Sequence, residues 1–185
     1  AEEREQVNVY DVVREEVDAH STYAEHRGVE LIFTEPEAGT SSALTLGKPA
    51  ALGIAVSNLL SNAIQFSPAG AHVGIGMELS KRHMTVTITD QGPGIAPEHL
   101  PRIFERFYRV DSSRSRDGGG TGLGLSITRH TLRAHGGDVD VWSQPGLGSS
   151  FTVTIPIVSS ADPEKKVKKR LKKLQKTHKV NEIGP

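Results

Sequence analysis

Two glycine-rich clusters between residues 90 and 125 restrict the structures open to this chain, because one ends a strand and the other begins a helix. The first reads Asp90-Gln91-Gly92-Pro93-Gly94-Ile95 and follows a segment in which apolar and polar residues alternate. A carboxylate beside two glycines is a hydrogen-bond acceptor that a flat ring can approach without meeting a side chain. The pattern therefore predicts a site for a planar group with an exocyclic amine.

The second cluster covers residues 118–125 and leads into an apolar helical pattern formed by Leu123, Leu125 and Ile127. Backbone N–H groups at the start of a helix attract an anion such as a phosphate. No Gly-Lys-Ser/Thr follows the cluster, and its spacing is not the dinucleotide pattern Gly-x-Gly-x-x-Gly. Taken by itself, the cluster is also compatible with a flexible loop.

A third element lies upstream, where Asn58 and Asn62 are four residues apart and Phe66 continues the same helix face. Two amides on an otherwise apolar helix need hydrogen-bonding partners. A hydrated divalent cation with phosphate oxygens would supply them. The alternative is that both amides cap or bridge neighbouring loops.

With these elements in this order, the chain from Val7 to Ile157 resembles the ATP-binding catalytic domain of bacterial sensor histidine kinases, in the GHKL superfamily. The resemblance implies an N box at 58–67, a G1 box at 90–95, an F box at 104–109, a G2 box at 120–125 and a final glycine motif at 146–149.

The order of apolar patterns predicts an α+β fold, a two-layer α/β sandwich with a mixed sheet. The resemblance names this the Bergerat fold and implies about five strands packed on three helices. Helices are expected at 7–27, 48–66 and 121–135, and strands at 29–33, 44–46, 72–79, 83–89, 139–142 and 150–157. Residues 96–119 are too long for an ordinary connection and are expected to form a mobile ATP lid.

Charge divides the chain into two parts, since residues from Asp162 onward carry +6 and the preceding residues −6. We therefore expect an ATP-binding domain at 1–160 and a basic, lysine-rich amphipathic tail at 161–185. The tail is suited to an anionic membrane surface or an acidic partner, and the alternatives are a solvated appendage or a segment of foreign origin. The absence of cysteine excludes disulfides, thiolate catalysis and cysteine-based zinc sites.

The resemblance implies a role for each box. Asp90 accepts a hydrogen bond from the adenine amine, Asn62 and Asn58 hold Mg²⁺, and Arg109 reaches the γ-phosphate, so that Asn58 and Arg109 are the implied catalytic residues. Phe104 and Phe107 are expected to anchor the lid. The other implied ATP-binding positions are Gln65, Phe66, Gly92, Gly94, Ile95, Tyr108, Gly120, Thr121, Gly122, Leu123, Gly124 and Leu125.

Two positions refine this expectation. The ATP-hydrolysing relatives carry a glutamate near Asn58, and an amide cannot act as a general base at neutral pH, which favours phosphotransfer over hydrolysis. Gln65 and Phe66 stand where most relatives have lysine followed by tyrosine or histidine, so that a charge near the phosphates is missing. None of the eight histidines lies in the phosphoacceptor pattern of the family. We therefore expect the acceptor histidine on a separate dimerisation domain.

The leading hypothesis is transfer of the γ-phosphoryl group of Mg-ATP to that histidine, and from there to an aspartate of a response regulator. The domain would be the cytoplasmic portion of a membrane-anchored sensor, without a nucleic-acid partner. The alternatives are a catalytically weak nucleotide-binding signalling module, which Gln65 supports, a gyrase- or chaperone-type ATPase, and an anti-sigma-factor Ser/Thr kinase. The kinase-like segment at 7–35 argues against the last.

Overall fold

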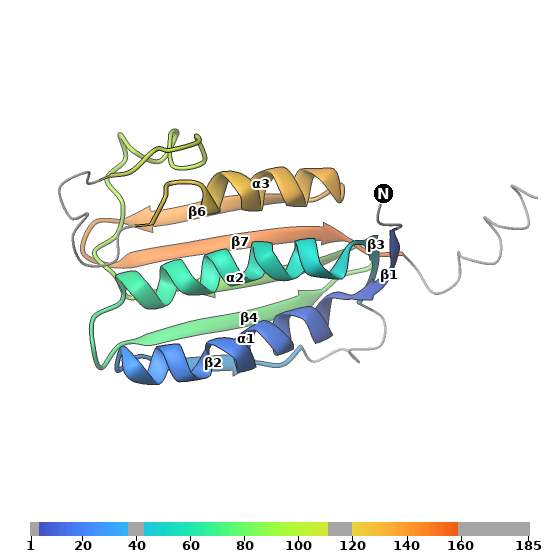
Figure 1. Cartoon of the computed structure of the whole chain (residues 1–185), viewed down its shortest axis with the longest axis horizontal. Coiled ribbons are helices and arrows are strands. Elements are labelled where there is room, and N and C mark those ends of the chain that lie inside the picture. Colours follow the sequence, from blue (N-terminus) through green and yellow to red (C-terminus); the bar gives the residue numbers. More distant parts are fainter. Residues whose placement is uncertain (1–3, 37–42, 111–119, 159–185) are drawn as a thin grey trace, which may run out of the picture.

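Three helices cover one face of a five-stranded sheet in the computed structural model, which describes residues 4–36, 43–110 and 120–158 (Figure 1). The elements are β1 (Glu5–Asn8), α1 (Val9–His26), β2 (Glu30–Thr34), β3 (Leu44–Gly47), α2 (Pro49–Phe66), β4 (His72–Leu79), β5 (His83–Thr89), α3 (Gly124–Ala134), β6 (Asp138–Gln144) and β7 (Gly148–Pro156). The expected α+β sandwich with a mixed five-stranded sheet and three helices is confirmed.

The main sheet has the strand order β2-β4-β5-β7-β6. Strand β2 runs parallel to β4, and every other neighbouring pair is antiparallel. The hairpin of β4 and β5 occupies the expected residues because its residues alternate between a buried and an exposed face. The last of the described strands, β7, lies between β5 and β6, at the interior of the sheet and not at its edge.

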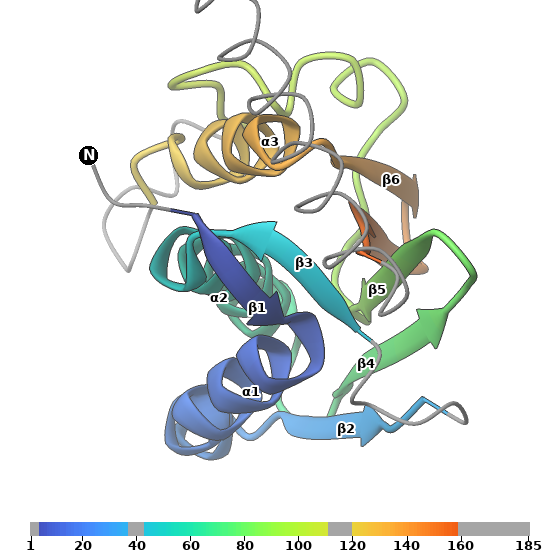
Figure 2. The same cartoon turned by 90° about the vertical axis from the view of Figure 1, so that its right-hand side faces the viewer.

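Strand β1 corrects the sequence-based expectation, which assigned residues 7 and 8 to the first helix. It pairs antiparallel with β3, and Figure 2 shows this two-stranded sheet crossing in front of the ends of α1 and α2. Helix α1 begins only at Val9, because the side chain of Asn8 accepts a hydrogen bond from the Tyr10 N–H and caps the helix. The four residues of β1 form a strand only because they pair with β3, about 40 positions later in the chain. A segment this short has no sequence pattern of its own that predicts a strand.

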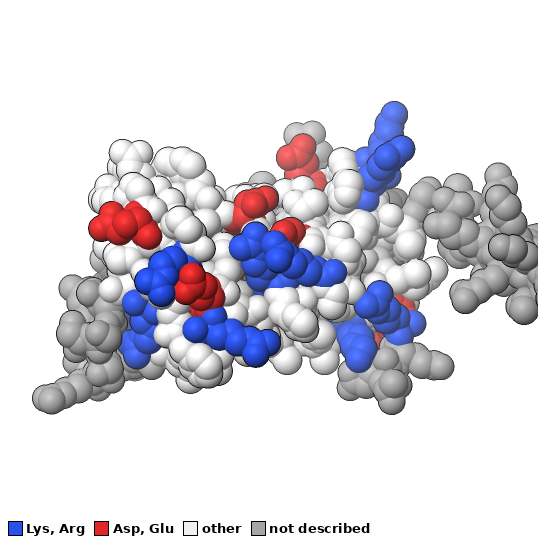
Figure 3. Space-filling view, turned by 90° about the horizontal axis from the view of Figure 1, so that it is seen from above, with Lys and Arg blue, Asp and Glu red and all other residues white. Residues whose placement is uncertain are grey.

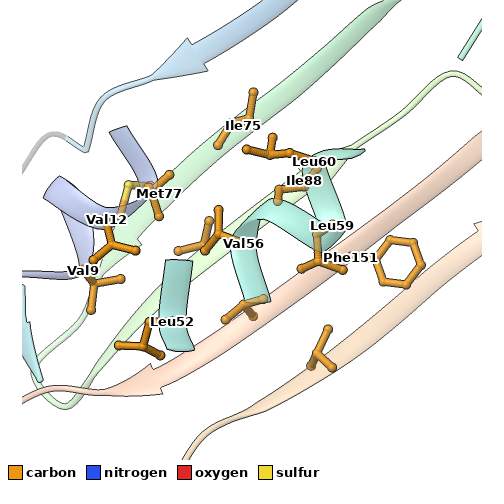
Figure 4. Close-up of a cluster of buried hydrophobic side chains, with 14 of the residues drawn as sticks. Val9, Val12, Leu52, Val56, Leu59, Leu60, Ile75, Met77, Ile88 and Phe151 are labelled. Carbon is orange, nitrogen blue, oxygen red and sulfur yellow. The ribbon is translucent and has the colours of Figure 1, made fainter. Parts of the chain in front are cut away.

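The core lies between α2 and the sheet. Helix α2 contains no charged residue, and its buried side chains meet those of the central strands (Figure 4). The labelled members of this cluster are Val9, Val12, Leu52, Val56, Leu59, Leu60, Ile75, Met77, Ile88 and Phe151. Burying one large aliphatic side chain fully contributes about 1.5–3 kcal/mol to folding. The core therefore holds α2 in a fixed position against the sheet.

Helix α3 begins three residues later than expected. Gly122 has a φ of +71°, which an α-helix does not accommodate, and the helix starts at Gly124. The second glycine cluster thus runs as irregular backbone into the first turn of α3. Among the described residues, no helix is long and apolar enough to cross a membrane. The proposed tail at 161–185 lies outside the described residues.

Candidate active site

Asp90 is the buried carboxylate of the site, with 6% of its surface exposed, and it follows directly after β5. Its Oδ1 accepts hydrogen bonds from the backbone N–H of Gly92 at 2.8 Å and of Ser149 at 3.2 Å. Its Oδ2 accepts none from the residues that the structure describes. One oxygen is therefore fixed by the backbone, and the other is available to a donor such as an amine.

Burial raises the pKa of the Asp90 carboxyl above its ordinary value, and the N–H groups of Gly92 and Ser149 only partly oppose that rise. The ionised form is therefore less favourable here than it would be in water. A further donor placed against Oδ2 would stabilise the charge, so the site is suited to a ligand that donates a hydrogen bond.

The glycines of the first cluster have a packing role that the sequence did not predict. A β-carbon on Gly92 would stand 2.9 Å from the carbonyl oxygen of Phe66, at the C-terminal end of α2. Gly94 has a φ of +73°, and a β-carbon there would collide with the carbonyl oxygen of Gln144. The space that these glycines leave is thus filled by protein backbone. They allow the cluster to fit between α2 and the turn joining β6 to β7.

That turn also holds the cluster through hydrogen bonds. The Gly146 N–H donates to the carbonyl oxygen of Pro93 at 2.8 Å, and the N–H of the half-buried Ile95 donates to the Ser143 hydroxyl at 2.8 Å. The final glycine motif identified in the sequence therefore supports the Asp90 loop, and Ser149 within it contributes one of the two N–H groups on the carboxylate.

Asn58 and Asn62 are both half-buried on α2. The amide nitrogen of Asn58 donates to the carbonyl oxygen of Gly124 at 3.2 Å, at the first residue of α3. Among the described residues, no hydrogen bond involves the side chain of Asn62. The two amides therefore keep oxygen atoms available, as ligands of a hard cation would require.

The two glycine clusters lie at the two ends of one stretch of α2. Gly92 packs on the carbonyl group of Phe66, while a β-carbon on Gly124 would stand 3.5 Å from the side-chain carbon Cγ of Asn58. Eight residues separate Asn58 from Phe66, which corresponds to about 12 Å along the helix. An elongated ligand could therefore contact Asp90 with one end and the start of α3 with the other.

At the start of α3, the backbone of the second cluster is joined to the F box. The Phe107 N–H donates to the carbonyl oxygen of Gly122 at 2.8 Å, and the Leu123 N–H donates to the Thr121 hydroxyl at 3.4 Å. Gly120 and Thr121 are exposed. Gly122, Leu123, Gly124 and Leu125 are half-buried. Among the described residues, the backbone that leads into α3 is thus at least partly exposed, as an anion site at a helix N-terminus would require.

The expectation that both phenylalanines anchor the lid is confirmed for Phe104 and wrong for Phe107. The Phe104 ring packs edge-on against Phe151 with centroids 6.4 Å apart, and the Arg129 guanidinium lies 4.7 Å from the ring centroid. Phe107 is 71% exposed and has a φ of +63°. Its hydrogen bond to Gly122 holds the backbone in this left-handed conformation and directs the ring into solvent.

The structure describes the first part of the expected lid, residues 96–110. Residues 96–110 form a series of hydrogen-bonded turns, in which the N–H groups of Arg102 and Ile103 both donate to the carbonyl oxygen of His99. Ile103 is buried, and the Tyr108 hydroxyl lies 2.6 Å from His99 Nδ1. Residues 111–119 lie outside the described residues. Arg109 is half-buried and makes no ion pair with any described residue, so its guanidinium is available to an anion.

Gln65 and Phe66 lie near the Asp90 end of α2. Phe66 is 57% exposed, and Gln65 is half-buried, with its carbonyl oxygen accepting a hydrogen bond from Arg27 at 2.9 Å.

Two hollows on the surface contain none of the predicted site residues. One lies on the outer face of the sheet around Gly74 and Gly76, and the other lies between α1 and α2.

The charged surface seen from above is mixed, with basic and acidic side chains next to one another and no single large basic patch on this face (Figure 3). Arg129 and Arg133 both pair with Asp138, at 3.2 and 3.1 Å, and Arg102 pairs with Glu105 at 3.2 Å.

Sequence reasoning missed Thr128, which is fully buried on α3 and lies 3.5 Å from the Asn58 amide nitrogen. It also missed the support that His99 gives to Tyr108. The available signal for Thr128 was its position four residues after Gly124, on the helix face that turns toward Asn58.

Taken together, these features define a two-layer α+β domain with an acceptor at the C-terminal end of α2 and the N-terminus of α3 beside the middle of α2. Residues 47–159 match the family described as "Histidine kinase-, DNA gyrase B-, and HSP90-like ATPase". The chain belongs to this family. Within it, the chain corresponds to the catalytic ATP-binding domain of sensor histidine kinases, which confirms the resemblance noted in the sequence.

Two curated relatives illustrate the likeness. The sensor-like histidine kinase SenX3 of Mycolicibacterium smegmatis is 41% identical over 158 residues, which cover 85% of this chain and 40% of SenX3. The sensor histidine kinase CusS of Escherichia coli K12 is 40% identical over 154 residues, which cover 83% of this chain and 31% of CusS. The chain thus spans less than half the length of these relatives.

Solved structures agree with the sequence relatives. The mycobacterial sensor histidine kinase MprB superposes with a TM-score of 0.70 at 31% identity, covering 84% of this chain and 99% of that one. Full-length ShkA in complex with AMPPNP superposes with a TM-score of 0.71 at 26% identity, covering 85% of this chain and 32% of that one.

Proposed function

We propose that this domain binds Mg-ATP and donates the γ-phosphoryl group to a histidine on a separate phosphoacceptor and dimerisation domain of the same kinase. Adenine would donate its amino group to Asp90, and the phosphates would lie against the start of α3. The observation that supports this most is the asymmetry of Asp90, whose Oδ1 accepts two backbone hydrogen bonds while Oδ2 accepts none from the described residues.

The side chains near the start of α3 fit a magnesium ion that arrives with the nucleotide. The described residues contain no group of three or more histidine, cysteine, aspartate or glutamate side chains suited to a metal. Magnesium keeps several waters and bridges phosphate oxygens, so that one or two neutral amides are adequate protein ligands. Asn62 and Asn58 would hold the ion, which would offset the charge of the phosphates during transfer.

Phosphotransfer is favoured over hydrolysis because Asn58 cannot activate water as a base. In the transfer, a nitrogen of the acceptor histidine bonds to the γ-phosphorus while the bond to the β–γ bridging oxygen breaks. ADP leaves with that electron pair, and the remaining ring proton passes to solvent or to a base on the acceptor domain. The guanidinium of Arg109, which has no ion pair with any described residue, would stabilise the charge on the transferred group.

The similarity to sensor histidine kinases supports a proposed role in a signalling pathway. SenX3 and CusS are sensor histidine kinases. By analogy, this domain would be the cytoplasmic portion of a membrane-anchored sensor, and the phosphohistidine would pass its phosphoryl group to an aspartate of a response regulator. The specific observation that favours the weaker alternative, a signalling module with little catalysis, is the missing charge at Gln65.

Labelled ATP added to this domain and a separately purified phosphoacceptor domain of the same kinase tests the proposal. We expect acid-labile label on the acceptor domain only when magnesium is present, and less label with Arg109→Ala. Release of inorganic phosphate without a labelled acceptor would identify an ATPase instead. Tight ATP binding without either product would favour the signalling module.

A further inference from the structure

Thr128 is a buried hydroxyl next to the proposed magnesium ligand Asn58. It lies on α3 with 0% of its surface exposed, and its hydroxyl donates to the carbonyl oxygen of Ala55 on α2 at 3.3 Å. A threonine hydroxyl has one proton to donate. Since that proton is used by Ala55, Thr128 presents only its lone pairs to any other neighbour.

The neighbour is the amide nitrogen of Asn58, which lies 3.5 Å from the Thr128 oxygen and 3.2 Å from the carbonyl oxygen of Gly124. Both groups on α3 are therefore acceptors where they face Asn58. A side-chain amide has a donor end and an acceptor end. The donor end must turn toward α3, and the amide oxygen Oδ1 must turn away from these two acceptors.

Gly124 leaves room beside that oxygen. A β-carbon at this position would stand 3.6 Å from Asn58 Oδ1, in van der Waals contact with it. With glycine, this contact is missing at the turn of α3 where the phosphates are proposed to lie. The orientation of the amide and the absence of a side chain at Gly124 therefore both favour access to the same acceptor.

We propose that Thr128 is a positioning residue for magnesium, because it fixes the Asn58 amide with its oxygen toward the metal. The inference rests on the proposed function. It also explains why an amide is suited to this position better than a carboxylate. An aspartate would place a negative oxygen against two acceptors on α3, and the repulsion would offset its greater attraction for the cation.

The first test is Thr128→Val, which keeps the shape of the side chain and removes the hydroxyl. Calorimetry measures the affinity for ATP with magnesium and in excess chelator, and the ratio of the two is the gain due to the metal. We expect this gain to fall roughly three- to tenfold, the effect of losing one hydrogen bond, while the metal-free affinity stays unchanged. Thr128→Ser, which keeps the hydroxyl, should restore the gain.

Thr131→Val is the matched control, since it makes the same change one turn later on α3 and its side chain makes no hydrogen bond to another described residue. An equal loss of the metal-dependent gain in both variants would show a general effect on the helix and overturn the inference. An unchanged gain in Thr128→Val would overturn it too. A wild-type domain without any metal-dependent gain would overturn the proposed function as well.

The second test does not depend on the stability of the valine variant. Asn58→Asp should reduce the metal-dependent gain, although it adds a charge that attracts the cation. Adding Thr128→Val to Asn58→Asp should recover part of that loss, because one of the two repelling acceptors is removed. A larger gain in Asn58→Asp alone than in the wild type would show that α3 does not constrain this position, and would overturn the inference.

Discussion

Asp90→Asn separates the binding role of this residue from its role in folding. The asparagine has the same shape, and its Oδ1 can still accept the hydrogen bonds from Gly92 and Ser149. Its amide nitrogen takes the place of the second carboxylate oxygen and presents a donor to the adenine amine, which is also a donor. The substitution therefore removes the proposed contact to the base and leaves the loop intact.

The expected loss of affinity follows from the hydrogen bond removed. A hydrogen bond to a charged group contributes about 1.5–3 kcal/mol. Since about 1.4 kcal/mol corresponds to a factor of ten, the dissociation constant for ATP should rise roughly 10- to 150-fold. ADP binding should weaken by the same factor, because both nucleotides carry the same base.

Asp90→Asn should weaken nucleotide binding without lowering the stability of the fold. Burial raises the pKa of Asp90 in the folded state, so its favourable contribution is fully present below the ordinary value of 3.8 and is lost as pH rises through the raised pKa. At neutral pH the ionised carboxylate therefore costs stability, and asparagine removes that cost. The melting temperature of the variant without nucleotide should be unchanged or higher.

Calorimetry and thermal melting at neutral pH check both expectations. Asp140→Asn is the matched control, because it makes the same change at an exposed residue of β6. Unchanged ATP affinity in Asp90→Asn would refute the assignment of the adenine contact. A melting temperature well below that of the control would show that the charged form supports the fold, against the argument from burial.

Four further predictions concern other parts of the chain. Leu60→Ala, at a fully buried position, should lower the free energy of unfolding by about 2–5 kcal/mol in urea denaturation; less than 1 would contradict the packing described. Gly122→Ala should weaken ATP binding more than Gly70→Ala, since both glycines have positive φ but only the first has backbone within 3 Å of the added carbon. Gln65→Lys should change ATP and ADP binding by the same factor, because Gln65 lies at the Asp90 end of α2 and away from the start of α3; a calorimetric gain for ATP alone would instead indicate a place near the terminal phosphate. Removing the residues after Ser160 should leave ATP affinity unchanged. Unfolding of the truncated chain would show that the tail belongs to the domain and would contradict a boundary at residue 160.

Much of the fold could be predicted because its signals are local. The hairpin of β4 and β5 and the apolar helix α2 each repeat a short pattern, and both were found with bounds within one residue. Strand β1 could not be found, because its four residues are defined by pairing with β3, about 40 positions away. The start of α3 was missed because the conformation of Gly122 is set by contact with the F box.

In the candidate site, too, the features with a local sequence pattern could be predicted and those that depend on distant contacts could not. The carboxylate of Asp90 beside glycines at the end of a strand is visible in the sequence pattern, but the pairing of its Oδ1 with the backbone of Gly92 and Ser149 is not. The orientation of Phe107 and the contact between Thr128 and Asn58 depend on how two distant segments meet. Composition gives no information on such contacts, so the expectation for Phe107 was wrong and Thr128 was overlooked.

The position of β7 has a consequence for synthesis. Ser149, which supplies an N–H to Asp90, belongs to this strand, and β7 joins β5 to β6 at the interior of the sheet. A ribosome therefore releases the residues around Asp90, the proposed adenine acceptor, long before the strand that completes its hydrogen bonds. Until β7 inserts, β5 lacks one neighbour and β6 has no partner in the sheet. The nascent domain should gain affinity for nucleotide only in its last folding step, when its own exposed strand edges also disappear.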